Sequence, residues 1–87
     1  MATLDEVLDL VTDELMRAEE IFPNKFNSAH EGFAILREEV DELWEAVKLK
    51  RETNDVRDAM QRLARIQTEA IQVAAMAIRL VRDSCLP

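Results

Sequence analysis

Two pairs of oxygen-bearing side chains have the spacing of one helical face. Glu39 and Glu42 are three residues apart, and so are Glu69 and Gln72. Residues three apart are neighbours on the surface of a helix, so two such helices packed antiparallel would bring the four groups together. Carboxylate and amide oxygens are the ligands that hard divalent cations prefer. The four residues are therefore candidate ligands for Mg²⁺ or Mn²⁺.

An alternative interpretation of these positions needs no metal ion. Charged residues at the edge of a helical core usually form a solvated rim, and Arg65 and Arg79 share the helical face of Glu69. Against this, like-charged carboxylates at a core edge repel each other and are costly to desolvate unless a cation joins them. The spacing alone leaves both interpretations open.

The elements that would position these groups are helices. One glycine, two prolines and 33% charged residues are typical of a helix-rich chain without strands. Capping boxes formed by Thr3 with Glu6 and by Ser28 with Glu31 start two helices, and Pro23 ends the first. We therefore expect a single all-α domain over residues 1–87. Its three helices are expected at about residues 4–22, 29–51 and 55–83.

Apolar side chains recur at three- and four-residue spacing along each predicted helix and define the face that packs inward. In the first helix they are Leu4, Val7, Leu8, Val11, Leu15 and Ala18, and in the second Phe33, Leu36, Val40, Leu43 and Val47. Glu39 and Glu42 lie on the flank of the second stripe, at the edge of the core. Asn54 is the expected cap of the third helix. The short connection before that helix favours antiparallel packing on the second.

The third helix carries more apolar surface than one neighbouring helix can cover. At 100° per residue its apolar side chains spread over roughly 220°, about twice a normal amphipathic stripe. Ala74, Ala75 and Ala77 would allow a close helix approach. A chain of 87 residues with a single cysteine, Cys85, also has a marginal core and no internal disulfide. We expect a homo-oligomer, a dimer or a tetramer, assembled as a helical bundle.

Charge and hydropathy argue against several classes of partner. The formal net charge is −7 and no cluster of Lys and Arg is present, which argues against binding to a nucleic-acid polymer. No stretch reaches the roughly 18 consecutive apolar residues of a membrane span. The N-terminal stretch lacks the basic and apolar regions of a signal peptide. These patterns predict a cytoplasmic protein that binds neither a nucleic-acid polymer nor a membrane.

Two short acidic motifs resemble those of the MazG-like, all-α nucleoside triphosphate pyrophosphohydrolases. The run Glu38-Glu39-Val40-Asp41-Glu42-Leu43 resembles their EExxE motif. Glu69, which stands 27 residues beyond Glu42, matches the first residue of their second motif, ExxD. Residues 26–32 and 69–77 look like a short branch of the family from phages and mobile elements. The resemblance extends over residues 4–84.

This resemblance implies Mg²⁺-dependent cleavage of a nucleoside triphosphate between its α- and β-phosphates, with release of a monophosphate and pyrophosphate. Metal ligation would fall on Glu39, Glu42 and Glu69. Gln72 stands where the family has aspartate, and its amide oxygen can still ligate Mg²⁺ or hold a metal-bound water. Glu38 is the candidate for orienting or deprotonating the attacking water, with a solvated surface glutamate as the alternative.

Six further residues are candidates for contact with a nucleotide. They are Lys25, Asn27, His30, Trp44, Lys48 and Arg79. Cations and a helix N-terminus attract phosphate, and an indole can stack on a base. Solvation, salt bridging and core packing are the ordinary alternatives for these residue types. The competing hypothesis for the whole chain is a non-catalytic helical protein-interaction module with an acidic rim, which Gln72 favours.

Overall fold

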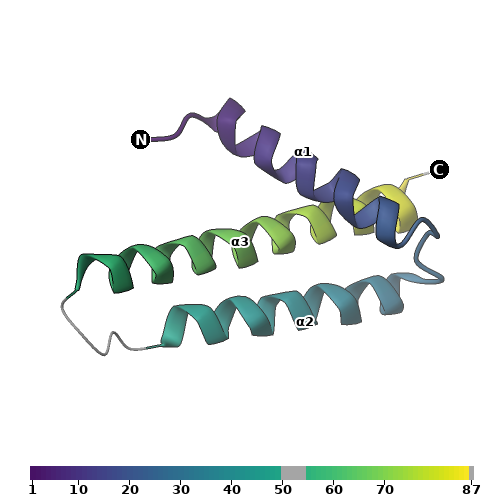
Figure 1. Cartoon of the computed structure of the whole chain (residues 1–87). Helices are drawn as coiled ribbons and strands as arrows, with labels where there is room; N and C mark the ends of the chain where they lie inside the picture. Colours follow the sequence, from purple (N-terminus) through teal and green to yellow (C-terminus); the bar gives the residue numbers. More distant parts are fainter. Residues whose placement is uncertain (50–54, 87) are drawn as a thin grey trace.

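The computed structural model describes residues 1–49 and 55–86, which form an all-α protomer (Figure 1). Its helices are α1 (Leu4–Ile21), α2 (Ala29–Lys48) and α3 (Val56–Leu80), and a short π-helix, Val81–Cys85, continues α3. No strand occurs in the described residues, so the predicted all-α protomer with three α-helices is confirmed. None of these helices is long and apolar enough to span a bilayer.

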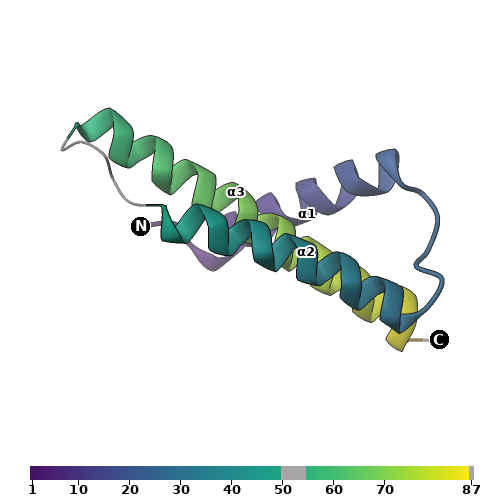
Figure 2. The ribbon, with the colours of Figure 1, turned by 90° about the horizontal axis from the view of Figure 1, so that it is seen from below.

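The helix α3 is the central element, because both other helices pack against it. The helix α2 lies alongside α3 and runs in the opposite direction, as Figure 1 and Figure 2 both show. The predicted antiparallel pairing of the second and third helices is therefore confirmed. The helix α1 crosses α3 at an angle, and none of its Cα atoms comes within 8 Å of a Cα atom of α2. The backbones of the two outer helices are thus held apart, while each packs against α3.

Side-chain caps fix where the helices begin. The Thr3 hydroxyl accepts a hydrogen bond from the Glu6 N–H at 3.2 Å, and the Ser28 hydroxyl accepts one from the Glu31 N–H at 3.1 Å. Both predicted N-caps are thereby confirmed. At the start of α3 the observed cap is Asp55, whose side chain accepts from a backbone N–H of the first turn. The predicted cap, Asn54, lies outside the described residues.

The helix ends differ slightly from the prediction. Phe22, predicted as the last residue of the first helix, has non-helical dihedral angles because Pro23 disfavours the helical region at the residue before it. The helix α2 ends at Lys48, and the predicted last two positions, 50 and 51, lie outside the described residues. The α-helical part of α3 ends at Leu80 rather than at residue 83, where the chain has already widened into the π-helix.

The core lies mainly where α1 crosses α3. Val11 and Ala18 of α1 are buried there against Ala75 and Met76 of α3. The predicted stripe of the first helix is therefore correct around the crossing point. Its N-terminal members are exposed instead; these are Leu4, Val7 and Leu8. These three residues belong to the N-terminal part of α1, which diverges from α3 before the crossing point.

The predicted buried stripe of the second helix is wrong at three of its five positions, and of the other two Leu36 packs against the core. Phe33, Val40 and Val47 are exposed, and the remaining two members, Leu36 and Leu43, are half-buried. The helix instead buries Gly32 and Ala46. The distance between helix axes depends on the side chains at the contact, and small residues permit the closest approach. This rotation leaves the larger apolar side chains on an outer face of α2.

Replacing Gly32 by alanine is expected to destabilise the protein, although alanine is the better helix former. An added Cβ would lie 2.5 Å from Leu80 Cδ1 and 2.7 Å from Phe26 Cδ2. Overpacking usually costs about 1–3 kcal/mol, against a propensity gain of about 0.5–1 kcal/mol. Urea unfolding should show a lower midpoint for Gly32→Ala. The control is Ala34→Gly at an exposed position of α2, which measures the effect of helix propensity without any change in packing. An unchanged urea midpoint for Gly32→Ala would contradict the expected crowding.

Candidate metal site and adjoining cavity

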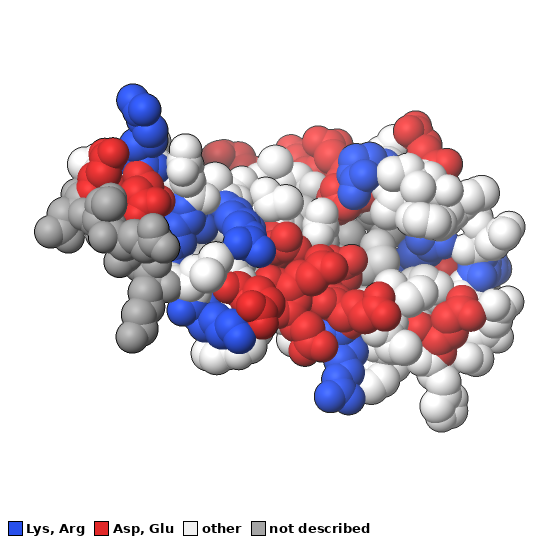
Figure 3. Space-filling model, turned by 60° about the horizontal axis from the view of Figure 1, so that its bottom comes forward, with Lys and Arg blue, Asp and Glu red and all other residues white. Residues whose placement is uncertain are grey.

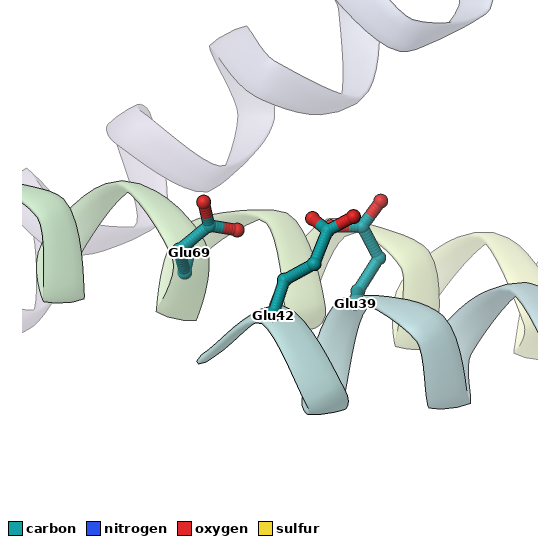
Figure 4. A group of neighbouring side chains, drawn as sticks. All are labelled: Glu39, Glu42 and Glu69. Carbon is teal, nitrogen blue, oxygen red and sulfur yellow. The ribbon is translucent and has the colours of Figure 1, made fainter. Parts of the chain in front are cut away.

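Three carboxylates from two helices converge on one point. Glu39 and Glu42 extend from α2, and Glu69 extends from α3 beside them (Figure 4). One oxygen from each side chain lies within 4.8 Å of the others. Glu39 and Glu69 are half-buried and Glu42 is exposed. The antiparallel packing of α2 on α3 therefore brings together the groups whose spacing singled them out.

The amide of Gln72 lies between two of these carboxylates. With Nε2 turned toward them, it donates to Glu39 Oε2 at 3.0 Å and to Glu69 Oε2 at 3.1 Å. A half-turn of the amide brings its oxygen to the same place. An amide oxygen cannot accept a hydrogen bond from an ionised carboxylate, so that second orientation needs either a proton on one of the carboxyls or a cation among the oxygens. Without a metal ion, Gln72 can therefore bridge the two carboxylates by hydrogen bonds. With a metal ion, its amide oxygen can act as a fourth ligand.

The crowding of carboxylates changes their acidity. Burial raises the pKa of Glu39 above its ordinary value, and the negative charges of Glu42 and Glu69 raise it further. Burial also raises the pKa of Glu69, the charge of Glu42 adds to this, and Arg65 acts in the opposite direction. Figure 3 shows a central patch of acidic side chains on one face of the molecule. A divalent cation bound here would offset both the repulsion and the desolvation.

These raised pKa values predict how the stability of the metal-free protein depends on pH. A glutamate whose pKa is higher in the folded state binds protons more readily there. Its contribution to stability is complete below the unfolded pKa of about 4.3 and is lost as the pH rises through the folded pKa. We expect the free energy of unfolding of the parent, relative to a Glu39→Gln/Glu69→Gln double variant, to fall as the pH rises from about 4 through this range.

Chemical denaturation at a series of pH values measures this difference. The double variant is the matched reference, because every other titrating group is common to both proteins. Millimolar Mg²⁺ should reduce the fall, since a bound cation favours the ionised carboxylates. A parent-to-variant difference that stays constant across the pH series would contradict the proposed crowding.

A cavity of about 670 Å³ adjoins the carboxylates. Its walls come from the C-terminal half of α1, the connection at residues 22–28, and the facing sides of α2 and α3. Glu38, Glu39 and Gln72 line it, whereas Glu42 and Glu69 do not, so the cavity meets the carboxylate cluster at its Glu39 and Gln72 side. Its size falls within the range of about 300–1,000 Å³ that is usual for small-molecule sites. The cavity is therefore the natural place for a ligand that would contact a metal held by the carboxylates.

The connection at residues 22–28 is held in place by Arg79, which is only 4% exposed. Its Nη2 donates to the carbonyl oxygens of Phe22 at 2.6 Å and Asn24 at 2.5 Å. Its Nε donates to the Asp83 carboxylate at 3.4 Å, and its guanidinium carbon lies 4.9 Å from the ring centroid of Phe26. Arg79 thus positions the connection through three contacts, to Phe22, Asn24 and Phe26. Its fourth contact is the salt bridge to Asp83, and salt bridging was the alternative to phosphate binding for this residue.

The other predicted substrate-binding residues divide into two groups. Lys25 and Asn27 line the cavity, as Arg79 does. Asn27 also donates to the Glu31 carboxylate, from its Nδ2 at 2.7 Å and from its backbone N–H at 3.2 Å. Among the described residues, those of the prediction that do not line the cavity are His30, Trp44 and Lys48. Trp44 is exposed, and Lys48 forms an ion pair with Glu45 at 2.8 Å.

Sequence reasoning missed two charged residues of α1 that line the cavity, Glu14 and Arg17. Arg17 donates to the Glu14 carboxylate from Nε at 2.9 Å and from Nη2 at 2.6 Å. Its hydrogen bond to Glu14 and the charge of that carboxylate raise the pKa of Arg17, and the charge of Glu39 adds to this. The three-residue spacing of Glu14 and Arg17 was the available signal, but such pairs are common on solvated helix faces.

The donor set fits a hard divalent cation, because all its contributing atoms are carboxylate or amide oxygens. Two packed helices supply them, so the oxygens are held from both sides. A cation at this place would lie beside the cavity, where it could neutralise and polarise a phosphate group. Comparisons of the chain with protein-family models, with curated proteins and with solved structures find no match.

Proposed function

We propose that this protein is a Mg²⁺-dependent nucleotide pyrophosphohydrolase of the MazG-like type. It would cleave a nucleoside triphosphate between the α- and β-phosphates and release a monophosphate and pyrophosphate. The observation that carries the proposal is the convergence of Glu39, Glu42 and Glu69 within 4.8 Å at the edge of a cavity. The proposal includes assembly of the chain as a homo-oligomer, a dimer or a tetramer.

The three glutamates would hold Mg²⁺, or Mn²⁺, with the amide oxygen of Gln72 as a fourth donor. When bound, the ion would stabilise the negative charge that develops on the phosphate oxygens. Glu38 lines the cavity next to these ligands, and its exposed carboxylate would orient the attacking water and accept its proton. Glu38 is therefore the proposed general base. The support for this role is its place in the cavity wall beside Glu39, since it is not part of the carboxylate cluster.

The remaining walls of the cavity have the chemistry that a nucleotide needs. Lys25 and Arg17 place positive charge along it, and cations next to a phosphate chain stabilise its negative charge. Phe26, Ile35 and Met76 supply apolar surface on which a nucleobase could lie. Asn27 adds amide groups, which can hydrogen-bond the edge of a base. One edge of the acidic cluster, at Glu39, and the apolar surface thus line the same cavity.

The alternative function is a non-catalytic helical protein-interaction module with an acidic rim. Two observations favour it. The Gln72 amide can satisfy Glu39 and Glu69 by hydrogen bonds without a metal, and large apolar side chains such as Phe33 are exposed on α2. In such a module Mg²⁺ and nucleotides would have no specific site.

Mg²⁺ and nucleotide together discriminate between the two functions. We expect the melting temperature of the protein to rise when millimolar Mg²⁺ and a nucleoside triphosphate are added together, because ligands that bind the folded state stabilise it. Pyrophosphate release from a panel of nucleoside triphosphates then tests turnover directly. Neither stabilisation nor pyrophosphate release with any member of the panel would reject the enzymatic proposal in favour of the interaction module.

Replacing Gln72 by aspartate is expected to tighten Mg²⁺ binding and to increase pyrophosphate release. A carboxylate holds a hard cation more strongly than a neutral amide does, and we expect a gain in affinity of about tenfold, or about 1.4 kcal/mol. The metal-free variant should be less stable than the parent, because it loses the bonds to Glu39 and Glu69 and adds a fourth negative charge. Isothermal titration with Mg²⁺ measures the first effect and thermal unfolding the second.

The matched control for this change is Gln61→Asp, the same substitution at an exposed position of α3. It should alter neither Mg²⁺ affinity nor pyrophosphate release, and its stability should remain within about 0.5 kcal/mol of the parent. Equal Mg²⁺ affinities for the parent, Gln72→Asp and Gln61→Asp would remove Gln72 from the metal site.

A further inference from the structure

The cavity runs along the three helices and has two ends. One end is formed by the connection at residues 22–28, where α1 ends, α2 begins and α3 approaches its C-terminus (Figure 1). The residues that line the cavity nearest to this end are, on α1, α2 and α3 respectively, Ile21, Glu31 and Arg79. Those that line it farthest from this end are Glu14, Glu39 and Gln72. Seven or eight positions separate the two on each helix, which is about 10–12 Å at 1.5 Å per residue. The carboxylate cluster therefore adjoins the far end.

The chemistry of the two ends orients the proposed nucleotide. Phe26 and Asn27, which offer an apolar surface and amide groups to a base, belong to the connection. Glu39 and Gln72, which would hold the metal ion, lie at the far end. A base bound at the connection therefore directs the phosphate chain toward the far end of the cavity.

Among the described residues that line the cavity, Arg17 is the one cationic side chain at the far end. Lys25 belongs to the connection, and Arg79 is bound to the carbonyls of the connection. Arg17 pairs with Glu14, which lies three residues earlier in α1, so its side chain extends along the helix away from the connection. Its guanidinium therefore lies at the end of the cavity that the phosphates would occupy.

The charges at the far end act on one another across the cavity. The hydrogen bond to Glu14 and the charge of that carboxylate raise the pKa of Arg17, and the charge of Glu39 on α2 adds to this. In turn, the pKa of Glu39 is raised by burial, by the other carboxylates of the cluster and by the charge of Glu14. The Glu14–Arg17 pair on α1 is thus close enough to the metal ligands to act on a phosphate bound there.

The guanidinium of Arg17 has one edge bound and one edge open. Its Nε and Nη2 donate to the two oxygens of Glu14, at 2.9 and 2.6 Å, and so form a two-pronged contact along one edge. The other edge carries the N–H groups of Nη1 and the second one of Nη2, which have no acceptor among the described residues. The Glu14 side chain is 16% exposed and that of Arg17 is 55% exposed, so the carboxylate is sheltered while the guanidinium stays accessible. Glu14 thus orients Arg17 and leaves a second two-pronged donor for a ligand.

The metal-loaded cluster needs such a cation beside it. Three ionised glutamates carry three negative charges and Mg²⁺ carries two positive ones, so the loaded cluster keeps one negative charge. A triphosphate adds further negative charge to this end of the cavity. A planar guanidinium binds phosphate oxygens in pairs and stays charged at any physiological pH. Arg17 has the charge, the position and the free edge to offset this repulsion.

We propose that Arg17 binds the pyrophosphate portion of the substrate through its open Nη1–Nη2 edge, while Glu14 holds the opposite edge. This inference rests on the proposed function and assigns to Arg17 a catalytic role at the leaving group. Water adds to the α-phosphorus, and its proton passes to Glu38. The bond between the α-phosphorus and the bridging oxygen breaks, and its electron pair stays on the departing pyrophosphate. Arg17 stabilises the negative charge that develops there.

Inorganic pyrophosphate tests this contact without any nucleobase. Isothermal titration of the protein with pyrophosphate in millimolar Mg²⁺ measures it. We expect Arg17→Met to weaken pyrophosphate binding by at least about tenfold, since hydrogen bonds to charged groups are lost, and to leave Mg²⁺ affinity unchanged. In turnover assays the kcat of pyrophosphate release should fall as well, because the contact strengthens in the transition state. A solvated ion pair without a role in binding predicts none of these losses.

The matched control is Arg37→Met, which removes the same charge from an exposed position of α2 that does not line the cavity. It should bind pyrophosphate as the parent does. Both variants should melt close to the parent, because exposed ion pairs contribute little to stability. Arg17→Lys should restore only part of the affinity, because an ammonium cannot serve Glu14 and a phosphate through two planar edges. Full restoration by lysine would overturn the two-edge geometry.

The outcomes separate this inference from the proposed function. Parental pyrophosphate affinity in Arg17→Met would overturn the inference alone, because release of pyrophosphate from nucleoside triphosphates by the parent tests the function independently. A parent that binds Mg²⁺ but not pyrophosphate would also overturn it. A parent that releases no pyrophosphate from any nucleoside triphosphate would reject the proposed function, and the role of Arg17 with it.

Discussion

Replacement of Glu39, Glu42 or Glu69 by glutamine is expected to lower Mg²⁺ affinity by at least about 100-fold, since even residues that only support metal ligands contribute about 10- to 100-fold. Each change removes one negative charge from a cluster whose oxygens lie within 4.8 Å of one another. Pyrophosphate release should fall at least as far. Isothermal titration with Mg²⁺ and single-turnover assays measure the two effects for each variant.

The matched control for these changes is Asp41→Asn. Asp41 is an exposed acid on α2 between two of the ligands in sequence, and it is not part of the carboxylate cluster. It should therefore keep parental Mg²⁺ affinity. The three glutamine variants should remain folded without metal and be as stable as the parent or more stable, because repulsion is relieved. Three variants that bind Mg²⁺ as the parent does would mean that the site assignment is wrong.

Arg79→Met is expected to have the largest effect on stability, a loss of about 3–5 kcal/mol, because it removes one partner of a buried ion pair. The change deprives the carbonyls of Phe22 and Asn24 of their donor. It also leaves the Asp83 carboxylate, whose side chain is 4% exposed, with one remaining ion pair among the described residues, to Arg82 at 3.5 Å. Since small domains are stable by about 5–15 kcal/mol, the variant should be close to unfolding at ambient temperature.

Thermal and urea unfolding measure this loss, and Arg82→Met is the matched control three residues along the chain. Arg82 forms ion pairs with Glu19 and Asp83 but is itself exposed. Its replacement should cost no more than about 1 kcal/mol. Arg79→Lys should recover only part of the stability, because an ammonium lacks the planar fork that serves two carbonyls and a carboxylate. Equal losses for Arg79→Met and Arg82→Met would show that the connection is not held by Arg79.

The helices themselves could be predicted because their signals are local. The Thr3 and Ser28 caps, Pro23 and the apolar periodicity act within a few residues of where they stand. The rotation of α2 could not be predicted in this way. A periodic stripe shows which side chains prefer to be buried, whereas α2 buries Gly32 and Ala46, small residues that allow helices to pack closely. Which face of α2 packs inward depends on the shape of α3, and the sequence of α2 alone does not determine it.

In the candidate site, too, the features set by local spacing could be predicted and those set by long-range packing could not. The convergence of Glu39, Glu42, Glu69 and Gln72 followed from two spacings and one antiparallel pairing, all of which the sequence indicates. The cavity beside them did not follow, because α1 and the connection at residues 22–28 build it through long-range contacts. The hydrogen bonds of Arg79 to Phe22 and Asn24 join positions 57 and 55 residues apart in the chain. No local pattern marks an arginine for such a role.

The separation of the backbones of α1 and α2 has a consequence for how this architecture could diversify. Each of the two helical walls of the cavity packs on α3, α1 at the crossing point that buries Val11 and Ala18, and α2 along the face that buries Gly32 and Ala46. The carboxylates all belong to α2 and α3. A change at the α1–α3 crossing would therefore widen or narrow the cavity without moving the metal ligands. Selection on ligand shape and selection on phosphate chemistry would act on different helices, so that one could vary while the other stayed fixed.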